Sequence, residues 1–271
     1  MVETARPMPQ KNRILITGSS GMLGADLCQE LEKDYEVYGA DLVHRTSYTC
    51  PPKPERRRRI VHRFIKGDIT NRKSVANIVY RIKPDIVIHA AAWTDVDGCE
   101  LNKKKAYKIN SEGTKNVALA CRTANAPLIY ISTDFVFDGK KNRPYAEADR
   151  PNPISVYGGS KYKGEIYIKR ILRRYYILRT SWLYGRNGRN FVDIIIDKAK
   201  KERALKVVND QIGSPTYTKD LAKAIHAFLD RIFTKYEVRS TKYEFSQSMD
   251  PKPASDRSES GEHKFGSLQF F

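Results

Sequence analysis

The chain has 271 residues, a length that suits one large domain or one domain with a smaller lobe. Its 49 Lys and Arg residues exceed its 31 Asp and Glu residues, which gives a formal net charge of +18, and its hydrophobic content of 40% is too high for a disordered chain. No apolar run is long enough to span a membrane and no secretion signal is present, so we expect a folded cytoplasmic protein. The four cysteines form no CxxC pair, which argues against a metal site and a disulfide framework.

Apolar strand-like runs alternate with helix-like segments along the chain. The expected strands are residues 13–17, 36–39, 60–66, 85–89, 127–132, 175–179 and 205–208. The expected helices are residues 22–32, 71–83, 103–124, 157–170, 191–201 and, last, about 217–233. Strands this apolar must be buried on both faces, so the order predicts an α/β fold with a doubly wound parallel sheet of the Rossmann type.

The chain divides into four predicted parts. Residues 1–12 form an N-terminal extension, residues 13–180 the dinucleotide-binding domain, and residues 181–233 the segments of a small C-terminal substrate lobe. In residues 234–271 the apolar periodicity fades while six basic and six acidic side chains cancel, so we expect a loosely ordered tail.

A basic stretch lies between Leu42 and Lys66, where eight basic residues accompany one acidic residue, Glu55. No signature of a nucleic-acid-binding fold stands beside it, so a solvated loop is the favoured interpretation. Attraction of anionic nucleotide ligands is the second interpretation. A nucleic-acid binder with salt-sensitive affinity is the third.

Three glycines with GxxGxxG spacing, Gly18, Gly21 and Gly24, leave the first strand and open the first helix. A helix N-terminus with exposed amides attracts a pyrophosphate, and missing side chains let it approach, so this context predicts a dinucleotide site. Asp41 follows the second strand, where a carboxylate can bind the ribose hydroxyls and repel a 2′-phosphate. Arg45 can offset that repulsion, so NADPH or NADH remains open as the cofactor.

A second motif, Tyr157-Gly158-Gly159-Ser160-Lys161, places a phenol and an ammonium four residues apart. On a helix these two side chains share a face, and a nearby cation favours the phenolate, so Tyr157 is a candidate acid and base. The expected strand at residues 127–132 ends beside Thr133, at the sheet edge where open α/β folds bind ligands. Its hydroxyl is a candidate to hold a substrate carbonyl.

With these motifs the sequence resembles the extended short-chain dehydrogenase/reductases, which include the epimerase/dehydratase-like proteins, and within them the dTDP-4-dehydrorhamnose reductase family. The resemblance covers residues 13–229. Its motifs are TGSSGMLG (17–24), HAAAWTDVDGCE (89–100), INSEGTKN (109–116), STDFVFDG (132–139), YGGSK (157–161), RTSWLYG (179–185) and NDQIGSPTYTKDLA (209–222). It implies an oxidoreductase that reduces the C4 ketone of a dTDP-4-dehydro-6-deoxy sugar with NADPH or NADH, in dTDP-rhamnose biosynthesis.

The resemblance also implies roles for individual residues. Tyr157 would be the proton donor, Lys161 its partner and a ribose contact, Thr133 the carbonyl-orienting hydroxyl, and Asn110 the support of the lysine. The implied cofactor contacts, Tyr157 and Lys161 among them, include Gly18, Ser20, Gly21, Met22, Leu23, Gly24, Asp41, Asp68, Ile69, Ala90, Ala91, Ala92 and Thr94. The implied substrate contacts are Thr133, Asp134, Trp182, Asp210 and Gln211. A homodimer is the expected assembly.

Two departures separate the chain from the family pattern. Phe135 stands where many members carry Tyr, and residues 234–271 lack the family's final HxSN-like and Trp-containing segments, so the substrate lobe looks incomplete. Two other functions stay open. A nucleotide-sugar epimerase would use the same Tyr157 and Lys161, and a non-catalytic subunit, as in the regulatory subunit of methionine adenosyltransferase, would use the cofactor site for binding alone.

Overall fold

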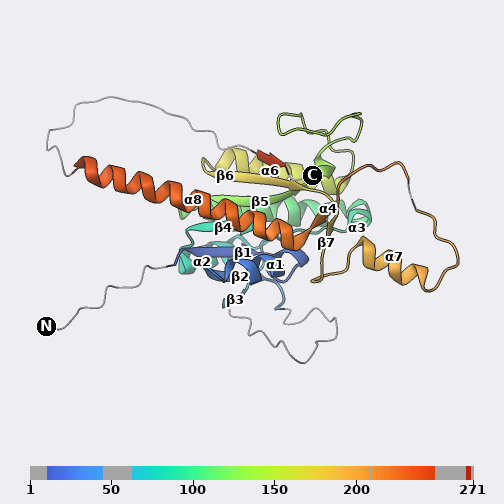
Figure 1. Ribbon diagram of the computed structural model, residues 1–271, viewed down its shortest axis with the longest axis horizontal. Coiled ribbons are helices and arrows are strands. Elements are labelled where there is room, and N and C mark those ends of the chain that lie inside the picture. The colour runs from blue at the N-terminus through green and yellow to red at the C-terminus, as the bar shows by residue number, and fades with distance from the viewer. Residues whose placement is uncertain (1–10, 45–62, 208, 248–266, 270–271) are drawn as a thin grey trace.

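The central element of the computed structural model is a parallel sheet with the strand order β3-β2-β1-β4-β5-β6-β9 (Figure 1). The structure describes residues 11–44, 63–207, 209–247 and 267–269. The strands are β1 (Arg13–Thr17), β2 (Glu36–Asp41), β3 (Arg63–Lys66), β4 (Ile86–His89), β5 (Leu128–Thr133), β6 (Tyr175–Thr180) and the short β9 (Ser267–Gln269). All adjacent strands of this sheet pair in parallel, which confirms the predicted Rossmann-type fold.

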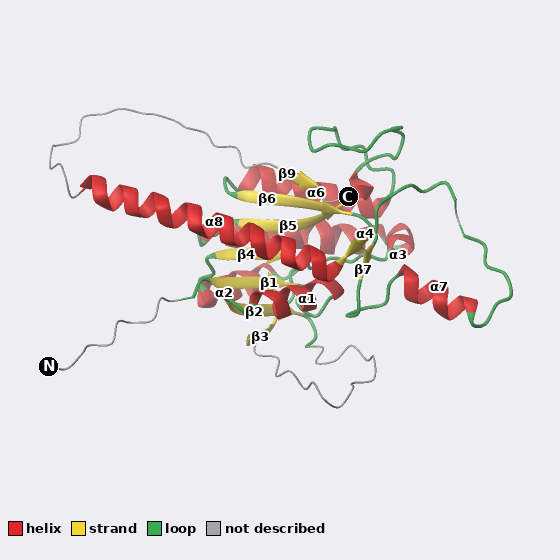
Figure 2. Cartoon of the chain, in the orientation of Figure 1, coloured by secondary structure: helices red, strands yellow, loops and turns green. Residues whose placement is uncertain are grey.

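Helices cover both faces of the sheet (Figure 2). One face carries α2 (Arg72–Ile82), α5 (Thr114–Thr123) and α6 (Val156–Ile171). The other face carries α1 (Met22–Leu31) and α8 (Thr218–Gln247). Buried strands with helices on both faces explain why the strand sequences read as continuous apolar runs.

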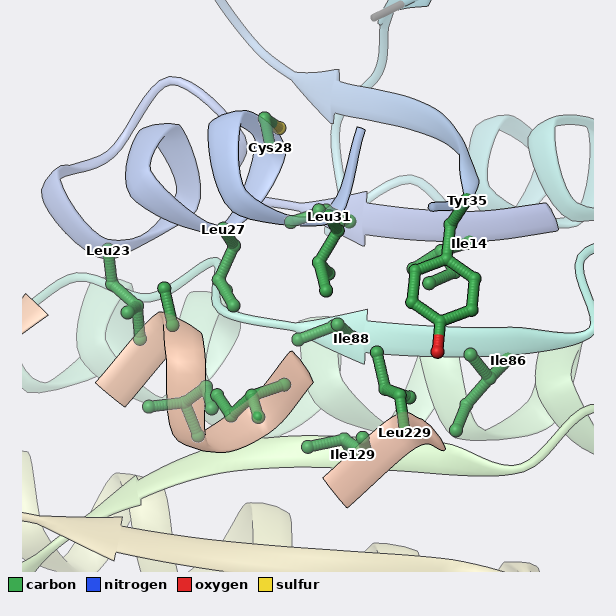
Figure 3. Packing of buried hydrophobic residues seen from close by; sticks show 14 of the residues in the cluster. Ile14, Leu23, Leu27, Cys28, Leu31, Tyr35, Ile86, Ile88, Ile129 and Leu229 are labelled. Carbon is green, nitrogen blue, oxygen red and sulfur yellow. The ribbon is translucent and has the colours of Figure 1, made fainter. Parts of the chain in front are cut away.

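Side chains of one strand alternate between the two helical layers. Ile14 and Ile16 of β1 belong to the cluster that packs against α1 and α8, whereas Leu15 between them belongs to the cluster under α2, α5 and α6. Figure 3 shows the first cluster, where Leu229 of α8 lies beside Ile86 and Ile129 of the sheet. The sheet is therefore fixed by apolar burial on both sides.

The strand order reverses between β1 and β4. β1 pairs with β2 on one side and with β4 on the other, and Thr17 stands beside His89 at the carboxyl ends of β1 and β4. Open α/β sheets bind ligands where the loops after two such strands diverge. This point of the sheet is the place to look for a site.

A small second region follows β6. It holds the parallel pair β7 (Leu183–Tyr184) and β8 (Thr216–Tyr217) and the helix α7 (Phe191–Ala199), which lies away from the sheet in Figure 1. No residue of α7 is buried. The first turns of α8, by contrast, bury Leu221 and Ile225 in the main core. The predicted division at residues 180 and 233 stays a prediction.

The helix predicted over residues 103–124 is confirmed as one helical run over residues 103–123, but the pitch changes within this run. The chain forms α3 (Val96–Leu101), α4 (Lys103–Ala106), a π-helix η1 (Tyr107–Gly113) and only then α5. The wide π turn carries Asn110, whose side chain bonds outside the helix, and π turns occur where a side chain must be re-aimed. Sequence periodicity does not show such a local change of pitch.

Two further differences lie in the C-terminal half. Residues 205–207 form no strand, because Lys206 and Val207 are exposed and have no neighbouring ladder; Val208 lies outside the described residues. Helix α8 continues to Gln247, through the first part of the segment expected to be loosely ordered. Residues 234–247 contain no glycine or proline, so no helix-breaking residue interrupts the helix there, although the apolar periodicity fades.

Two further observations concern the described residues. Within them no helix is long and apolar enough to cross a membrane. Cys28, Cys99 and Cys121 are buried and free, and Cys50 lies outside the described ranges together with most of the basic stretch, residues 45–62.

Candidate active site

The turn between β1 and α1 brings backbone, without side chains, to the sheet edge. Gly18 has a φ of +77°, and a Cβ there would lie 2.5 Å from the backbone nitrogen of Ala91. Gly24 packs directly on the carbonyl oxygen of Gly18, so no side chain fits at that position either. Helix α1 begins after Gly21 with no side-chain cap on its first amides, which suits an anion.

A groove of about 740 Å³ opens beside this turn, within the size range of ligand pockets. The predicted residues that line it are Gly18, Ser20, Gly21, Asp41, Asp68, Ile69, Ala90, Ala91, Ala92 and Thr94. This glycine-lined cradle and long groove fit a dinucleotide.

Five predicted cofactor residues do not line the groove, among them Tyr157 and Lys161 of α6. Leu23 is buried in the core cluster, Gly24 is packed against the turn, and Met22 lies against Gly188 of a later loop. The groove also includes Trp93, Lys105 and Lys108, which motif reasoning missed. The lysine-rich stretch at residues 103–108 could have indicated the two lysines, because cations at the wall of a groove bind phosphates.

Asp41 ties the end of β2 to the glycine-rich turn. Its Oδ2 accepts a hydrogen bond from the backbone nitrogen of Ser20 at 2.9 Å, and its Oδ1 accepts one from that of Leu42 at 2.7 Å. The Ser20 hydroxyl donates to the carbonyl of Val43 at 2.6 Å. The carboxylate is therefore held at the groove by two amides, while Arg45, its expected counter-charge, lies outside the described residues.

Tyr157 stands in the first turn of α6, and that turn is capped twice. Ser155 accepts from the backbone nitrogen of Gly158 at 3.1 Å, and Glu100 of α3 accepts from that of Val156 at 2.6 Å. The phenol is buried, which raises the pKa of Tyr157, while an interaction with the Thr133 hydroxyl acts in the opposite direction. Tyr157 is therefore a neutral, protonated phenol in this structure.

Lys161 lies one turn further along α6 and is also buried. Its Nζ donates to the carbonyl oxygen of Ile131 at 2.7 Å and lies 4.2 Å from the centroid of the Tyr130 ring. Burial lowers the pKa of Lys161 to about 7, and the Glu165 carboxylate opposes that shift. Its described contacts lie on β5, so the cation that was expected to stabilise a Tyr157 phenolate is itself poised between two protonation states.

Thr133 ends β5 and caps the short 3-10 helix η2 (Asp134–Val136). Its hydroxyl donates to Asp134 Oδ1 at 2.9 Å and accepts from the backbone nitrogen of Phe135 at 3.2 Å. Burial raises the pKa of the Asp134 carboxyl. The Phe135 ring meets Tyr157 edge to face at 5.6 Å, so this ring forms one wall around the phenol.

Asn110, in the π-helix, joins two walls of the site. Its side chain accepts from the backbone nitrogen of Trp93 at 2.8 Å and donates to the Trp93 carbonyl at 3.0 Å. It also donates to the Ser160 hydroxyl of α6 at 3.0 Å. Its described contacts thus hold the loop after β4 against the helix that carries Tyr157 and Lys161.

The predicted substrate residues of the second region are less closely held. Trp182 is 43% exposed and has a φ of +47°, an unusual backbone conformation for a large side chain, and it packs on Gly213. Asp210 and Gln211 are exposed, and no hydrogen bond joins their side chains to another part of the described chain. The structure does not bring these two into contact with Tyr157.

A buried hydrogen-bond chain that sequence reasoning missed underlies the site. His89 is fully buried, with Nδ1 at 2.6 Å from Thr17 Oγ1 and Nε2 at 3.0 Å from Thr114 Oγ1. Because the Thr114 hydroxyl donates to the Asn110 carbonyl at 2.7 Å, His89 must donate through Nε2 and accept through Nδ1. Burial lowers the pKa of His89 to about 3, so this neutral tautomer persists at pH 7.

A buried ion pair lies below helix α6. Glu165 accepts from Arg179 at 3.0 and 2.7 Å, and from the Ser132 hydroxyl at 2.6 Å. The pair links α6, β5 and β6. Within the described part of the chain no group of three side chains that could hold a metal ion occurs.

The chain is similar to known reductases over most of its length. A family model described as "RmlD substrate binding domain" matches residues 12–249. A dTDP-4-dehydrorhamnose reductase from Aggregatibacter actinomycetemcomitans is 37% identical over 236 residues, which cover 86% of this chain and 73% of that one. The spore coat polysaccharide biosynthesis protein SpsK of Bacillus subtilis is 39% identical over 213 residues, or 79% of this chain and 68% of its own.

A solved structure shows the same fold. The dTDP-4-dehydrorhamnose reductase of Bacillus anthracis, in complex with NADP, superposes with a TM-score of 0.70 at 41% identity. The match covers 82% of this chain and 71% of that one.

Proposed function

The chain belongs to the RmlD substrate binding domain family, and from this membership we propose that it is an NAD(P)H-dependent reductase of the C4 ketone of a dTDP-4-dehydro-6-deoxy sugar, converting dTDP-4-dehydrorhamnose to dTDP-L-rhamnose. One observation carries the proposal. The fold brings two buried hydroxyls, that of Thr133 at the end of β5 and that of Tyr157 against the Phe135 ring, to the carboxyl edge of the sheet that also bears the glycine-lined groove. A carbonyl needs such a hydrogen-bonding pair beside a source of hydride.

The groove residues would hold a nicotinamide dinucleotide in two halves. The open amides after Gly21 would take the pyrophosphate, and Asp41 would face the adenosine ribose. Asp68 and Ile69 would border the adenine, and the loop from Ala90 to Thr94 would line the nicotinamide half. The bound reduced nicotinamide supplies the hydride for the ketone carbon.

Tyr157 supplies the proton in this proposal. Burial keeps the phenol protonated, and an acid that holds its proton until an alkoxide forms is suited to the last part of the reduction. Thr133 would donate to the carbonyl oxygen and hold it beside the Tyr157 phenol, and Asp134 and Trp182 would contact the sugar nucleotide. Lys161, whose pKa of about 7 lets it gain or lose a proton near neutrality, would contact the ribose and return the proton to Tyr157.

The direct test is reduction of dTDP-4-dehydro-6-deoxy-L-mannose by the purified chain, followed as loss of absorbance of NADPH or NADH. The proposal expects cofactor oxidation that depends on the sugar nucleotide, and a product with a C4 hydroxyl. Reactions without the sugar nucleotide are the control. Binding of the cofactor without turnover would support the non-catalytic interpretation, and interconversion of sugar epimers without net cofactor oxidation would support an epimerase.

The predicted assembly and location follow from the same proposal. The substrate would be a cytoplasmic dTDP sugar, and the chain would act as a homodimer without a membrane or nucleic-acid partner. Light scattering on the purified chain measures the mass of the assembly. A monomer in solution would contradict the predicted homodimer and leave the proposed reaction open to the assay above.

A further inference from the structure

Asp26 is a buried carboxylate whose contacts lie outside the cofactor groove. It lies in α1, only 3% exposed, two residues beyond the last glycine of the cofactor turn. Its Oδ1 accepts from Asn187 Nδ2 at 2.8 Å, and its Oδ2 accepts from Thr218 Oγ1 at 2.5 Å. Both partners lie more than 150 residues away in the chain, as the separations of 161 and 192 show.

The two partners belong to the second region. Asn187 lies in the loop between β7 and α7, and Thr218, which is fully buried, begins α8 directly after β8. Gly185 packs on the side chain of Thr218, and a Cβ on Gly188 would lie 3.1 Å from the Cβ of Met22. Residues 185–190 therefore pack against the start of α1, beside the cofactor turn.

Asn190 extends this arrangement to helix α7. Its Nδ2 donates to the carbonyls of Gly185 and Gly188 at 3.1 and 3.3 Å, which closes the loop on itself. Its Oδ1 caps α7 by accepting from the backbone nitrogens of Val192 and Asp193 at 3.0 and 3.2 Å. The position of the loop thus sets the starting point of α7.

Apolar packing does not hold this loop and helix in place. No residue of α7 is buried, whereas hydrogen bonds from neutral donors to a buried carboxylate are among the stronger polar contacts in proteins. The carboxylate of Asp26 therefore fixes a region that would otherwise be free to shift relative to the cofactor groove.

We propose that Asp26 is a positioning residue that holds residues 185–190 and the start of α7 over the cofactor turn, and so sets the affinity for the sugar nucleotide. The proposal rests on the proposed reductase function, because residues 185–190 follow Trp182, a predicted sugar contact, and lie against Met22 at the start of α1. It predicts an effect on the KM of the sugar nucleotide and little effect on cofactor binding, since Asp26 does not line the groove.

Two substitutions separate positioning from simple loss of stability. Asp26→Leu keeps the branch at Cγ in a larger side chain and removes both acceptors, so the KM of the sugar nucleotide should rise about tenfold or more, while the Kd of NADPH changes less than about twofold. Asp26→Asn keeps one acceptor, and its amide can donate to the Thr218 hydroxyl or to a flipped Asn187, so it should restore most of the affinity. Asp220→Asn, an exposed carboxylate of α8, is the matched control and should behave as wild type.

Hydrogen exchange supplies a readout that does not need turnover. Amides of residues 185–193 should exchange faster in Asp26→Leu than in wild type, while those of β1 stay protected. If Asp26→Leu does not fold, Asn187→Ala removes the same contact from the loop side and should have the same effects. If wild type does not reduce the sugar nucleotide, the proposed function fails. Hydrogen exchange in residues 185–193 then decides by itself whether Asp26 positions this loop.

Three results would overturn the positioning role. They are an unchanged KM with unchanged exchange in residues 185–193, a similar rise in KM in the Asp220→Asn control, and a loss of NADPH affinity as large as the loss of sugar affinity. A lowered Tm with normal KM and normal exchange in that loop would likewise assign Asp26 to stability alone.

Discussion

The sheet and the second region are built in different ways. Every residue of β4 and β5 is buried, whereas no residue of α7 is. The sheet edge holds its loops by apolar burial on both faces and by the buried chain through His89, while the second region depends on a two-residue ladder and on polar contacts such as those of Asp26. The cofactor half of the site is therefore preorganised, and the sugar half is held by fewer contacts.

This difference bears on catalysis. Preorganised groups cost no reordering when the reaction occurs, whereas loosely packed elements open locally with small free energies. Tyr157, which we propose as the acid, belongs to the rigid half, together with its helix caps and the glycine-rich turn. Substrate affinity should be the more easily altered property of this protein, and cofactor binding the more robust one.

The largest expected effect comes from the acid of the rigid half. Tyr157→Phe keeps the ring that packs on Phe135 but removes the proton, so turnover should fall by about 10²–10⁴-fold while the Kd of NADPH stays nearly constant. Steady-state kinetics and fluorescence titration measure the two quantities. Tyr167→Phe, a half-buried tyrosine on the same helix that donates to Glu112, is the matched control. Normal turnover of Tyr157→Phe would remove this phenol from the mechanism.

The next largest effect is a difference in unfolding free energy between substitutions in the main core and substitutions in the second region. Leu229→Ala opens a cavity in the core between α8 and the sheet and should lower the free energy of unfolding by about 2–5 kcal/mol. Ile196→Ala on α7, where the side chain is 48% exposed, should change it by less than about 0.5 kcal/mol. Denaturant unfolding of both variants tests the contrast, and similar losses at the two positions would mean that α7 is covered in solution.

The pH dependence of stability tests the burial of Lys161. In the unfolded chain a lysine holds its proton to about pH 10.4, whereas in the folded chain the pKa is about 7. Between these values the unfolded state binds more protons, so this residue makes stability rise with pH, and below about pH 7 its full cost is present.

Lys161→Met removes that titration. The difference between wild type and variant should grow in favour of wild type by about 1 kcal/mol per pH unit above neutrality. Unfolding free energies measured from about pH 6 to about pH 9 check this, with Lys163→Met, an exposed neighbour on α6, as the control. Parallel curves for wild type and Lys161→Met would show that the buried amine keeps an ordinary pKa.

The smallest effect concerns the choice of cofactor. Asp41→Ala removes a negative charge from the groove and should shift the ratio of NADPH to NADH affinity toward NADPH by about tenfold. Asp41→Asn removes the charge and retains an acceptor for the amides of Ser20 or Leu42, so it separates charge from turn geometry. Titration of wild type and both variants with NADPH and NADH measures this ratio of affinities. A shift toward NADH would mean that Asp41 does not face the ribose.

Several features were predictable from the sequence because they depend on neighbours in the chain. The strand at Arg13–Thr17 and the glycine turn after it follow from local composition, and Tyr157 and Lys161 share a buried helix face because of their spacing. The glycine spacing and the order of strands and helices predicted the groove and part of its lining, such as Gly18 and Asp41, and the resemblance added Ala90, Ala91, Ala92 and Thr94. The end of the expected strand indicated Thr133, and the resemblance added Asn110, which spacing alone does not select.

The tertiary structure decided what depends on partners far apart in the chain. Burial on every side, and not the expected neighbouring cation, sets the pKa of Tyr157, and the same burial lowers that of Lys161. The π turn at Asn110, the tautomer of His89 and the hydrogen bonds of Asp26 each need groups that only folding brings together. Local sequence determines backbone preference and apolar pattern, so the sequence by itself determined the sheet and the motifs. Desolvation and hydrogen-bond partners arise from packing, so only the tertiary structure decided the protonation of the site residues and the contacts that hold them.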